Sequence, residues 1–221
     1  MIESFIFAGK SSDTMGVIMS KEWIPTKPEI RYETTEIDGR DGAIIEKRGY
    51  SMVQRDIECT LINRNKLNDV VAWLNGDGVF EFNGRYCNAH IYSSVDYENL
   101  GINKCSFTIP FLFEPFWYRE DGYHLYKDGE TVENKGNYEA TPMIEITGSG
   151  SGTITVGDTD INVIELKEGE VLLVDCLEMS ENLPTRVGIG FEYPRLKPGK
   201  NVIGITGALQ VRIKRKDRWL A

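Results

Sequence analysis

Few residues in this chain have the type and spacing that catalysis needs. It contains only two histidines, His90 and His124, and neither has a second histidine or a Cys-x-x-Cys pair nearby, although a zinc site needs three or four ligands at short spacings. No Gly-x-Ser-x-Gly sequence leads into a helix, as it does in many serine hydrolases. We therefore predict no catalytic residue, no metal ligand and no cofactor, and we interpret His90 as a hydrogen-bonded structural residue of a strand.

A glycine-serine run superficially resembles a phosphate-binding loop. Residues Gly148–Gly152 read Gly-Ser-Gly-Ser-Gly, but such loops bind anions because the amides of a following helix point at the phosphate. Here the β-type sequence Thr153–Val156 follows instead. The run is therefore predicted to be a flexible turn.

Charged residues leave several interpretations open. A pair of carboxylates could hydrolyse a glycosidic bond, but no spacing selects a particular pair. The one basic cluster, Arg212–Arg218, could contact nucleic acid or an acidic partner. Because Leu209, Val211 and Ile213 alternate with polar residues, the favoured interpretation is a solvated outer face of the last strand.

The elements that would position these residues are mostly strands. Apolar-polar alternation and the turn residues between the alternating segments predict strands in the first part of the chain at residues 4–7, 17–19, 30–37, 43–45, 53–62, 80–82, 87–92 and 105–113. The dipeptide Asn83-Gly84 predicts a tight hairpin between two of them. In the second part, strands are predicted at residues 153–156, 161–166, 171–176, 202–205 and 209–213.

The helical period occurs convincingly once. Leu67, Val70, Val71 and Leu74 follow the i, i+3, i+4, i+7 spacing of one helix face, which predicts a helix over Asn63–Asn75. An asparagine at 63 or 65 would cap its start, and the glycine at 76 would end it. We expect its apolar face to pack on a sheet.

A stretch rich in glycine and proline, residues 134–152, predicts a boundary between two domains. The part before it contains most of the aromatic residues and the helix. The part after it has short strands separated by Gly and Pro turns, which favours an antiparallel sandwich. We expect a mainly β chain of two domains, residues 1–134 and 135–221.

The composition excludes some classes of protein. With 41% hydrophobic and 27% charged residues the chain is that of an ordinary globular protein. Residues 1–134 hold 14 Lys and Arg against 22 Asp and Glu, which argues against tight binding to a phosphate backbone. The longest apolar stretch, Phe107–Tyr118, contains two prolines and a glutamate and is shorter than the roughly 20 residues that span a membrane.

The cysteines predict no redox or metal chemistry. They are far apart, and none forms a Cys-x-x-Cys pair: Cys59, Cys87, Cys105 and Cys176. Each lies among strand-like neighbours, where a free cysteine usually behaves as a small buried apolar residue. We expect reduced core thiols, with disulfides as the less favoured alternative.

Eight short segments carry a family resemblance. In the first part they are Phe5–Gly9 with Ser12–Val17, the Gly-Arg-Asp-Gly loop within Ile37–Gly42, Ala72–Gly78 with Phe80–Phe82, and Phe107–Phe111 continuing to Pro115-Phe116. In the second part they are Asn134–Ala140 with Pro142, Thr147–Gly150, Leu196–Asn201 and Arg218–Leu220. In this order, over essentially the whole chain, they resemble the distal tail protein (Dit) family of bacteriophages with long non-contractile tails that infect Gram-positive bacteria.

The resemblance implies a structural virion protein rather than an enzyme. In that family the first domain is a tail-tube-like β-sandwich or barrel with one flanking helix and a protruding hairpin. Six copies close into a ring through a repeated head-to-tail interface, and the ring continues the tube and leaves a channel for DNA. The second domain, a galectin-like antiparallel β-sandwich, attaches other parts of the tail tip.

The resemblance also implies partners and a location. The expected partners are further copies of the chain in a hexamer, the tail tube protein, a tail-associated lysin or tail fibre protein, and a baseplate or receptor-binding protein. Neither a membrane nor tightly bound nucleic acid is expected. The protein would be made in the host cytoplasm and would lie at the tail tip of the virion.

Two sets of site residues are predicted on this basis. The first set, within residues 37–50, is expected to form ring contacts or the hairpin that faces the lumen: Arg40, Asp41, Arg48 and Tyr50. The second set is aromatic and is expected to pack at the border of the two domains: Phe113, Phe116 and Trp117.

Two other functions stay open. A carbohydrate-binding module would recognise host cell-wall sugar through the C-terminal sandwich, usually on aromatic rings exposed on a sheet face. That part of the chain offers few such rings beyond Phe191, Tyr193 and Trp219. A wall-degrading hydrolase would need one carboxylate whose substitution abolishes turnover.

Overall fold

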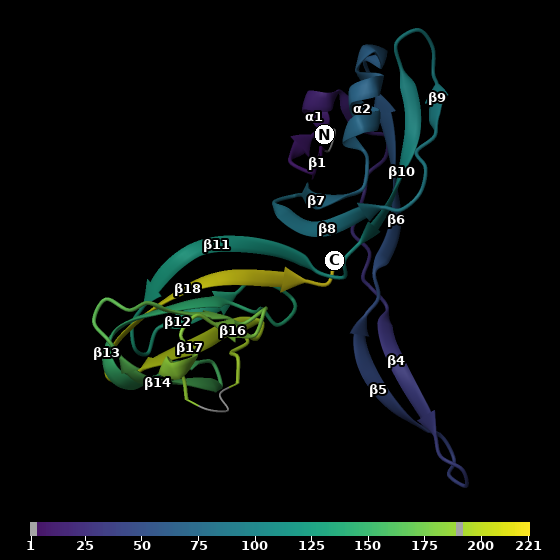
Figure 1. The fold of residues 1–221 in the computed structure, drawn as a ribbon. Helices are drawn as coiled ribbons and strands as arrows, with labels where there is room; N and C mark the ends of the chain where they lie inside the picture. Colours follow the sequence, from purple (N-terminus) through teal and green to yellow (C-terminus); the bar gives the residue numbers. More distant parts are fainter. Residues whose placement is uncertain (1–3, 189–191) are drawn as a thin grey trace. The chain divides into compact units, whose positions relative to one another are not determined.

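The computed structural model describes residues 4–188 and 192–221, which divide into two compact units (Figure 1). The first unit runs to Trp117 and includes Leu220–Ala221, and the second unit is Tyr118–Trp219. Strands make up 56% of the chain and helices 8%, so the predicted mainly β fold class is confirmed.

The first unit contains ten strands and two short α-helices among its described residues. Their bounds are β1 Ile6–Phe7, β2 Lys10–Ser11, α1 Ser12–Met15, β3 Val17–Met19, β4 Ile30–Glu36, β5 Ala43–Tyr50, β6 Val53–Leu61, the 3-10 helix η1 Arg64–Lys66, α2 Leu67–Trp73, β7 Asp77–Phe82, β8 Arg85–Ile91, β9 Tyr97–Asn99 and β10 Cys105–Phe113. The main sheet is antiparallel in the order β2-β1-β7-β8-β10-β6-β3, and β9 lies beside the start of β10. The pair β4–β5 forms a separate two-stranded sheet.

The longest ladder of the first unit joins β6 and β10. Nine residue pairs connect the two strands, and the last of them is Phe113 with Val53. Because side chains alternate along a strand, Phe107, Ile109 and Phe111 are buried, whereas the residues between them face outward. One face of the ladder therefore supplies the core and the other face is polar.

Aromatic side chains fill this core. The ring of Phe80 on β7 lies 5.1 to 5.2 Å from the rings of Phe5, Phe111 and Phe113. Trp73, the last residue of α2, stacks on Phe5 and donates its indole N–H to the backbone carbonyl of β1 at 2.8 Å. The helix is thus fixed on the sheet by ring packing, with each ring pair adding about 0.5–1.5 kcal/mol beyond burial.

Two local predictions in this unit are confirmed. The predicted helix forms as η1 followed by α2, and Asn63 caps it, since its side-chain oxygen accepts the Asn65 N–H at 3.1 Å. Asn83 and Gly84 join β7 to β8 with φ angles of 50° and 71°, the positive values that a type I′ turn requires. The one-turn helix α1 lies directly before β3. No helix in the described ranges is long and apolar enough to cross a bilayer.

The second unit is built around one long strand. Its elements are β11 Trp117–Tyr126, β12 Thr131–Asn134, β13 Met143–Val156, β14 Thr159–Leu166, β15 Leu172–Asp175, β16 Ser180–Glu181, the 3-10 helix η2 Pro184–Arg186, β17 Gly199–Ile205 and β18 Ala208–Trp219. The first half of β13 pairs with β15 and β18, and its second half pairs with β14 and β17. Branched aliphatic residues from these strands form the core, among them Ile144, Ile146, Ile154, Ile161, Val211 and Ile213.

The structure places the domain boundary earlier than predicted, between Trp117 and Tyr118 rather than after Asn134. Strand β12 lies before the predicted boundary, but it pairs with β17 from Thr131 to Asn134 and so belongs to the second unit. This correction changes the distribution of charge. The first unit holds 12 Lys and Arg against 17 Asp and Glu, and the second unit holds 13 against 17, so both units are acidic to nearly the same extent.

The predicted flexible turn at Gly148–Gly152 is wrong, because these residues lie within β13. A Cβ atom on Gly148 would lie 2.2 Å from the Ala208 carbonyl oxygen, and one on Gly152 would lie 2.3 Å from the Thr206 carbonyl oxygen. The glycines let two backbones approach closely where β13 passes from one set of partners to the other.

The four cysteines are free and buried, as predicted. Burial raises the pKa of Cys59 and of Cys176 to about 12. Since the thiolate is the nucleophile and the metal ligand, these side chains are inert packing residues at neutral pH.

Candidate functional site

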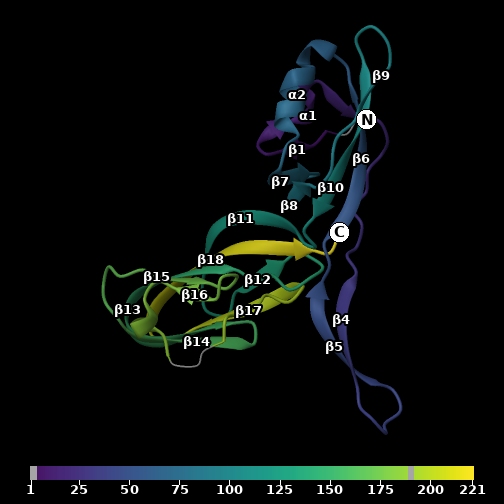
Figure 2. The ribbon, with the colours of Figure 1, turned by 45° about the vertical axis from the view of Figure 1, so that its right-hand side comes forward.

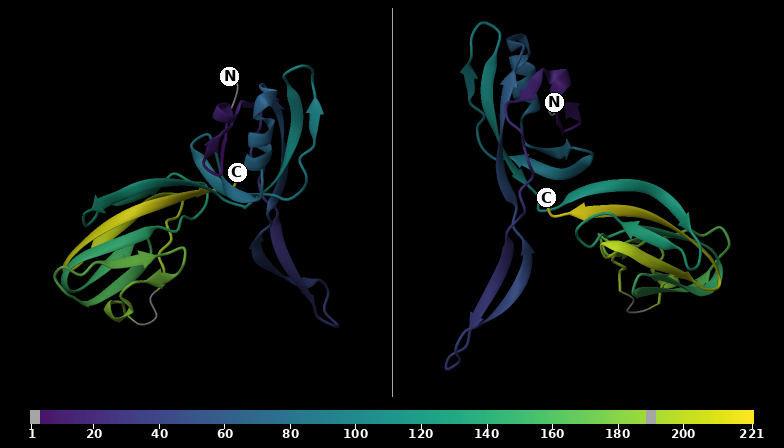
Figure 3. Two further views of the ribbon diagram at one scale, coloured as in Figure 1. Left: turned by 45° about the horizontal axis from the view of Figure 1, so that its top comes forward. Right: turned by 180° about the vertical axis from the view of Figure 1, so that it is seen from behind.

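The β4–β5 hairpin is the most exposed structure of the first unit. Every residue from 31 to 48 is exposed, although both strands are long and paired with each other. In the ribbon views the hairpin extends away from the main sheet of its unit (Figure 2), and the views from above and behind agree (Figure 3). An isolated two-stranded hairpin is marginally stable in water, so a hairpin whose residues 31–48 are all exposed suits a surface that binds a partner.

The two faces of the hairpin differ in chemistry. Directly opposed residues share a face. On one face, Glu33 lies opposite Glu46, and Arg48 bridges both carboxylates at 2.5 and 2.9 Å. On the other face, the side chains of Tyr32 and Ile45 are 59% and 64% exposed. The first face is therefore largely ion-paired, although it also exposes Ile44, whereas the second face carries the two most exposed apolar groups of the hairpin.

The base of the hairpin is tied to the first unit by an aromatic contact. The rings of Tyr50 and Phe116 meet edge to face at 5.6 Å, and Lys47 lies 4.5 Å from the centre of the Tyr50 ring. Just above this contact the ladder shifts register between Ile30 and Tyr32, and Gly49 on the other strand has a φ of 96°. Such a bulge bends a hairpin and increases its twist.

The structure separates the four predicted ring or lumen residues into two groups. Arg40 and Asp41 lie in the exposed turn at the tip of the hairpin, and within the described residues neither forms an ion pair. Arg48 is near the end of β5, where its charge is paired with Glu33 and Glu46, and Tyr50 is at the base. All four thus belong to one hairpin, and their role in assembly stays a prediction.

The predicted aromatic set divides in a similar way. Phe113 and Trp117 are buried in the core of the first unit, where both rings contact Trp23 at 5.4 and 5.8 Å. Phe116 is half-buried and contacts Tyr50 at the hairpin base. Packing at the border of the two units stays a prediction for all three.

A polar groove lies on the outer face of the β6–β10 ladder. Its volume is about 510 Å³, and its lining includes the carboxylates of Asp56, Glu58, Asp96 and Glu98. Lys21 pairs with Glu58 at 2.6 Å. Within the described ranges, no group of three or more His, Cys, Asp or Glu side chains is placed to hold a metal ion. The groove therefore presents acidic and hydroxyl groups on a sheet face.

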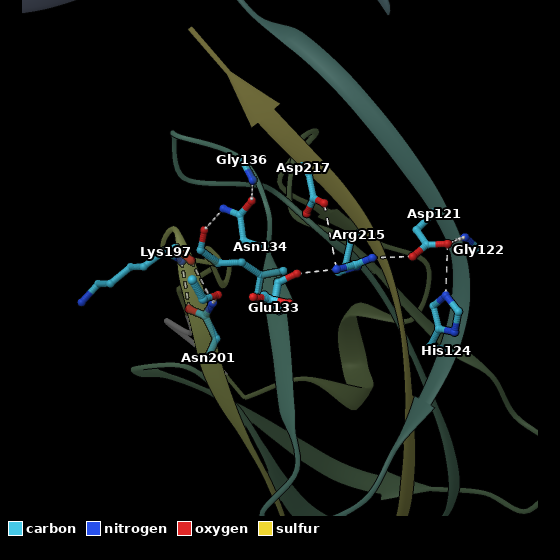
Figure 4. Close-up of polar contacts among 12 residues, drawn as sticks. Asp121, Gly122, His124, Glu133, Asn134, Gly136, Lys197, Asn201, Arg215 and Asp217 are labelled. Atoms are coloured by element: carbon cyan, nitrogen blue, oxygen red, sulfur yellow. Dashed lines mark hydrogen bonds and ion pairs between the residues drawn. The ribbon is translucent and has the colours of Figure 1, made fainter. Parts of the chain in front are cut away.

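The second unit contains a charged network that the sequence analysis missed (Figure 4). Arg215 is only 9% exposed; its guanidinium donates to the Asp121 carboxylate and to the backbone carbonyl of Glu133. His124 lies 3.2 Å from Asp121 on the solvent side. A signal was present in the sequence, because Arg215 continues the inward-facing phase of Leu209, Val211 and Ile213 in β18.

The outward-facing basic residues of β18 are also paired. Arg212 contacts Glu145 at 2.7 Å, and Lys214 contacts Glu120 at 2.8 Å. The interpretation as an outer strand face is thus confirmed for Arg212 and Lys214 and is wrong for Arg215, which faces the core. Carboxylates from neighbouring strands balance this face.

The residues considered for sugar binding and catalysis are structural where they are described. Trp219 is 8% exposed, and the Tyr193 hydroxyl donates to the Glu181 carboxylate, which raises the pKa of Tyr193 to about 12. Phe191 lies outside the described residues. His90 is hydrogen-bonded to Asp77 at 2.8 Å, so its interpretation as a bonded strand residue is confirmed.

The network predicts how acid destabilises the second unit. Hydrogen bonds from Arg215 and His124 lower the pKa of Asp121 to about 2. Because the pKa of Asp121 is lower in the folded chain than in the unfolded chain, its ionised carboxylate stabilises the fold. This contribution is complete above about pH 4, the ordinary pKa of an aspartate in the unfolded chain, and it is lost as the pH falls to about 2. Asp121 is 44% exposed, so solvent screening limits the contribution to about 1 kcal/mol.

Asp121→Asn is expected to lower the free energy of unfolding at pH 7. It is also expected to flatten the acid limb, which is the fall of that free energy between about pH 4 and pH 2, measured by urea titrations. An unchanged acid limb would contradict this account.

Comparison with known proteins assigns the fold. No family model matches the chain, and no curated protein matches it. Its fold is that of a hub protein from a phage adsorption apparatus, which confirms the resemblance at the level of the fold. The solved structure is SPP1 Dit (gp 19.1), described as a paradigm of the hub adsorption apparatus in phages that infect Gram-positive bacteria. It has a TM-score of 0.73 and 15% identity, and the match covers 98% of this chain and 99% of that chain. A chain of the phage P2 baseplate in its activated conformation with Ca matches with a TM-score of 0.46 and 12% identity, covering 98% and 99%.

Proposed function

We propose that this chain is a structural protein of a phage tail rather than an enzyme, and that copies of it close into a six-membered ring at the distal end of the tail. The ring links the tail tube to the baseplate or tail tip and leaves a channel for DNA. The observation that carries the proposal is the shared fold with SPP1 Dit over 98% of this chain and 99% of that chain.

The exposed hairpin gives the proposal a physical basis. A chain that keeps Tyr32 and Ile45 in water on an unsupported hairpin gains stability when a neighbour covers them, by about 25 cal/mol for each Å² of apolar surface removed from water. A head-to-tail contact of this kind, repeated around an axis, closes a ring. The two opposed charges at the tip, Arg40 and Asp41, would fix the register between neighbours.

The two units have different roles in this proposal. The first unit is the tail-tube-like domain that forms the ring and contacts the tail tube protein. The second unit is the galectin-like domain, which contacts a tail-associated lysin or tail fibre protein and a baseplate or receptor-binding protein. The chain is made in the cytoplasm of the bacterial host and resides in the tail tip of the virion.

Arg40 provides a single-residue test of the hairpin. Because it is exposed and forms no ion pair within the described residues, Arg40→Ala is expected to change monomer stability by less than about 0.5 kcal/mol. Truncating an arginine that is a hot spot of an interface costs more than about 1 kcal/mol, and we expect Arg40 to be one. The protein concentration at half-assembly is therefore expected to rise by roughly tenfold, measured by sedimentation velocity. Lys27→Ala, at an exposed site outside the hairpin, is the matched control. If the two variants assemble equally well, Arg40 does not contribute to the interface.

The location of the protein tests the function itself. Gold-labelled antibody against the chain is expected to mark the distal end of the tail in purified particles of the phage that encodes it. Absence of the chain from purified virions would contradict the proposal. A carbohydrate-binding module would instead give a glycan-array signal that persists with monomeric protein, and no aromatic platform among the described residues favours it.

A further inference from the structure

The core of the second unit changes character along strand β18. Its inward-facing residues are apolar up to Ile213, but the next two are Arg215 and Asp217, which are only 9% and 3% exposed. Burying charged groups is unfavourable unless each of their polar atoms is paired. This end of the sandwich therefore has to satisfy every donor of the guanidinium and every acceptor of the carboxylate.

The protein satisfies most, but not all, of these atoms. Arg215 donates to Asp121 and to the Glu133 carbonyl, and the Lys135 backbone N–H donates to the Asp217 carboxylate. Arg215 Nε and Asp217 Oδ1 are fully buried and have no hydrogen-bond partner among the described residues. The closest approach of the two side chains, from Arg215 Nη1 to Asp217 Oδ2, is 4.0 Å, which is too long for a hydrogen bond.

The two unpartnered atoms make opposite demands on a ligand. Asp217 Oδ1 needs a donor, and Arg215 Nε needs an acceptor. A cation at this position would be repelled by the guanidinium, and an anion would be repelled by the carboxylate. We propose that the end of the second unit's core holds one internal water molecule, which donates to Asp217 Oδ1 and accepts from Arg215 Nε.

A third polar atom lies in the segment beside this site. A buried water usually makes about three hydrogen bonds, and Thr141 Oγ1 is also buried with no partner among the described residues. Thr141 belongs to the segment between the pairs Tyr138↔Arg218 and Met143↔Lys214, so it runs alongside Arg215 and Asp217. Burial raises the pKa of Asp217, and a water that donates to Oδ1 opposes this rise.

The water joins two sets of contacts into one network. On one side it reaches Lys135 through Asp217, and on the other it reaches β11 and β12 through Arg215. The segment that follows β12 is then held to the last strand by hydrogen bonds. This inference concerns packing within the second unit and does not depend on the proposed function.

A crystal structure of the full chain, at a resolution that shows ordered water, tests the inference. We expect one density peak within about 2.7–3.2 Å of both Arg215 Nε and Asp217 Oδ1. A direct ion pair between these side chains, or the two atoms facing each other with no density between them, would overturn it.

Two variants separate water binding from simple packing. Asp217→Asn leaves a polar carboxamide at the site, so the density peak of the water is expected to stay. Asp217→Leu removes the polar atoms, so the peak is expected to disappear. A peak that persists unchanged in Asp217→Leu would overturn the proposed ligands. If Asp217→Leu does not fold, the wild-type and Asp217→Asn structures still decide the question, because absence of the peak from both contradicts the inference.

Discussion

Replacing the β4–β5 hairpin by a two-residue turn is expected to give a folded monomer that no longer forms rings. Ile30 and Tyr50 lie directly opposite each other in the ladder, so Asn-Gly inserted between them can close the chain as a type I′ turn. Residues 31–48 are exposed throughout and Gly49 has no side chain, so replacing residues 31–49 by Asn-Gly should change the free energy of unfolding by less than about 1 kcal/mol. Retaining Tyr50 keeps its contact with Phe116.

Sedimentation velocity and thermal unfolding together check this expectation. The shortened chain should sediment as a monomer at concentrations where the native chain is assembled, while its melting temperature stays close to that of the native monomer. Ile45→Lys is the single-site version, and Val202→Lys is its matched control, because the two side chains are 64% and 56% exposed and only the first lies on the hairpin. Rings formed by the shortened chain would show that assembly uses another surface.

The largest expected loss of stability comes from one methyl group in the second unit. A Cβ atom on Gly136 would lie 2.1 Å from the backbone oxygen of Arg218, at the point where Tyr138 bridges to the last strand. The neighbour is backbone, so it cannot rotate away. Gly136→Ala is therefore expected to lower the free energy of unfolding by about 3 kcal/mol, the upper end of the usual cost of overpacking and a large part of the 5–15 kcal/mol typical of a domain.

The control for this substitution is Gly122→Ala. Gly122 has no heavy atom within 4 Å of an added Cβ and no positive φ, so its substitution should change stability by less than about 0.5 kcal/mol. Urea titrations followed by far-ultraviolet circular dichroism measure both variants. Equal stability of the two would mean that the segment at Gly136 can move away from Arg218 at little cost.

The periodicity of short sequence windows correctly predicted the helices, strands and turns that neighbouring residues alone determine. The Asn83-Gly84 turn needs only two positive φ angles, and the α2 helix needs only an apolar face, so short windows of sequence contain both signals. Strand β10 was predicted for the same reason, since every second residue from Cys105 to Phe113 is buried. Alternation identified the β4 and β5 regions as strands, but it could not show that both faces of the hairpin are exposed, because that depends on what the rest of the chain leaves uncovered.

The wrong predictions concern residues whose conformation is set by partners that are distant in the sequence. Strand β11 reads Trp-Tyr-Arg-Glu-Asp-Gly-Tyr-His-Leu-Tyr and lacks alternation, because Glu120 and Asp121 pair with basic residues of β18. Missing this strand moved the predicted domain boundary too late. The run Gly148–Gly152 has the sequence of a flexible turn, because sequence alone does not distinguish a glycine that allows close backbone approach from one that allows a turn.

The candidate site was predicted in part. The Gly-Arg-Asp-Gly motif led to the tip of the hairpin, where Arg40 and Asp41 are exposed as an interface would require. The apolar pair on one face, Tyr32 and Ile45, was not singled out, because strand residues of this type are usually buried. Their exposure follows from the tertiary structure, in which β4 and β5 form a separate two-stranded sheet.

The mass of the purified chain in solution tests the central claim most directly. Multi-angle light scattering of the full-length protein is expected to give about six times the chain mass of 25.0 kDa, with negative-stain images of a closed annulus from the same fraction. A particle that stays at the mass of one chain, even at high protein concentration, would contradict the account of a ring-forming hub.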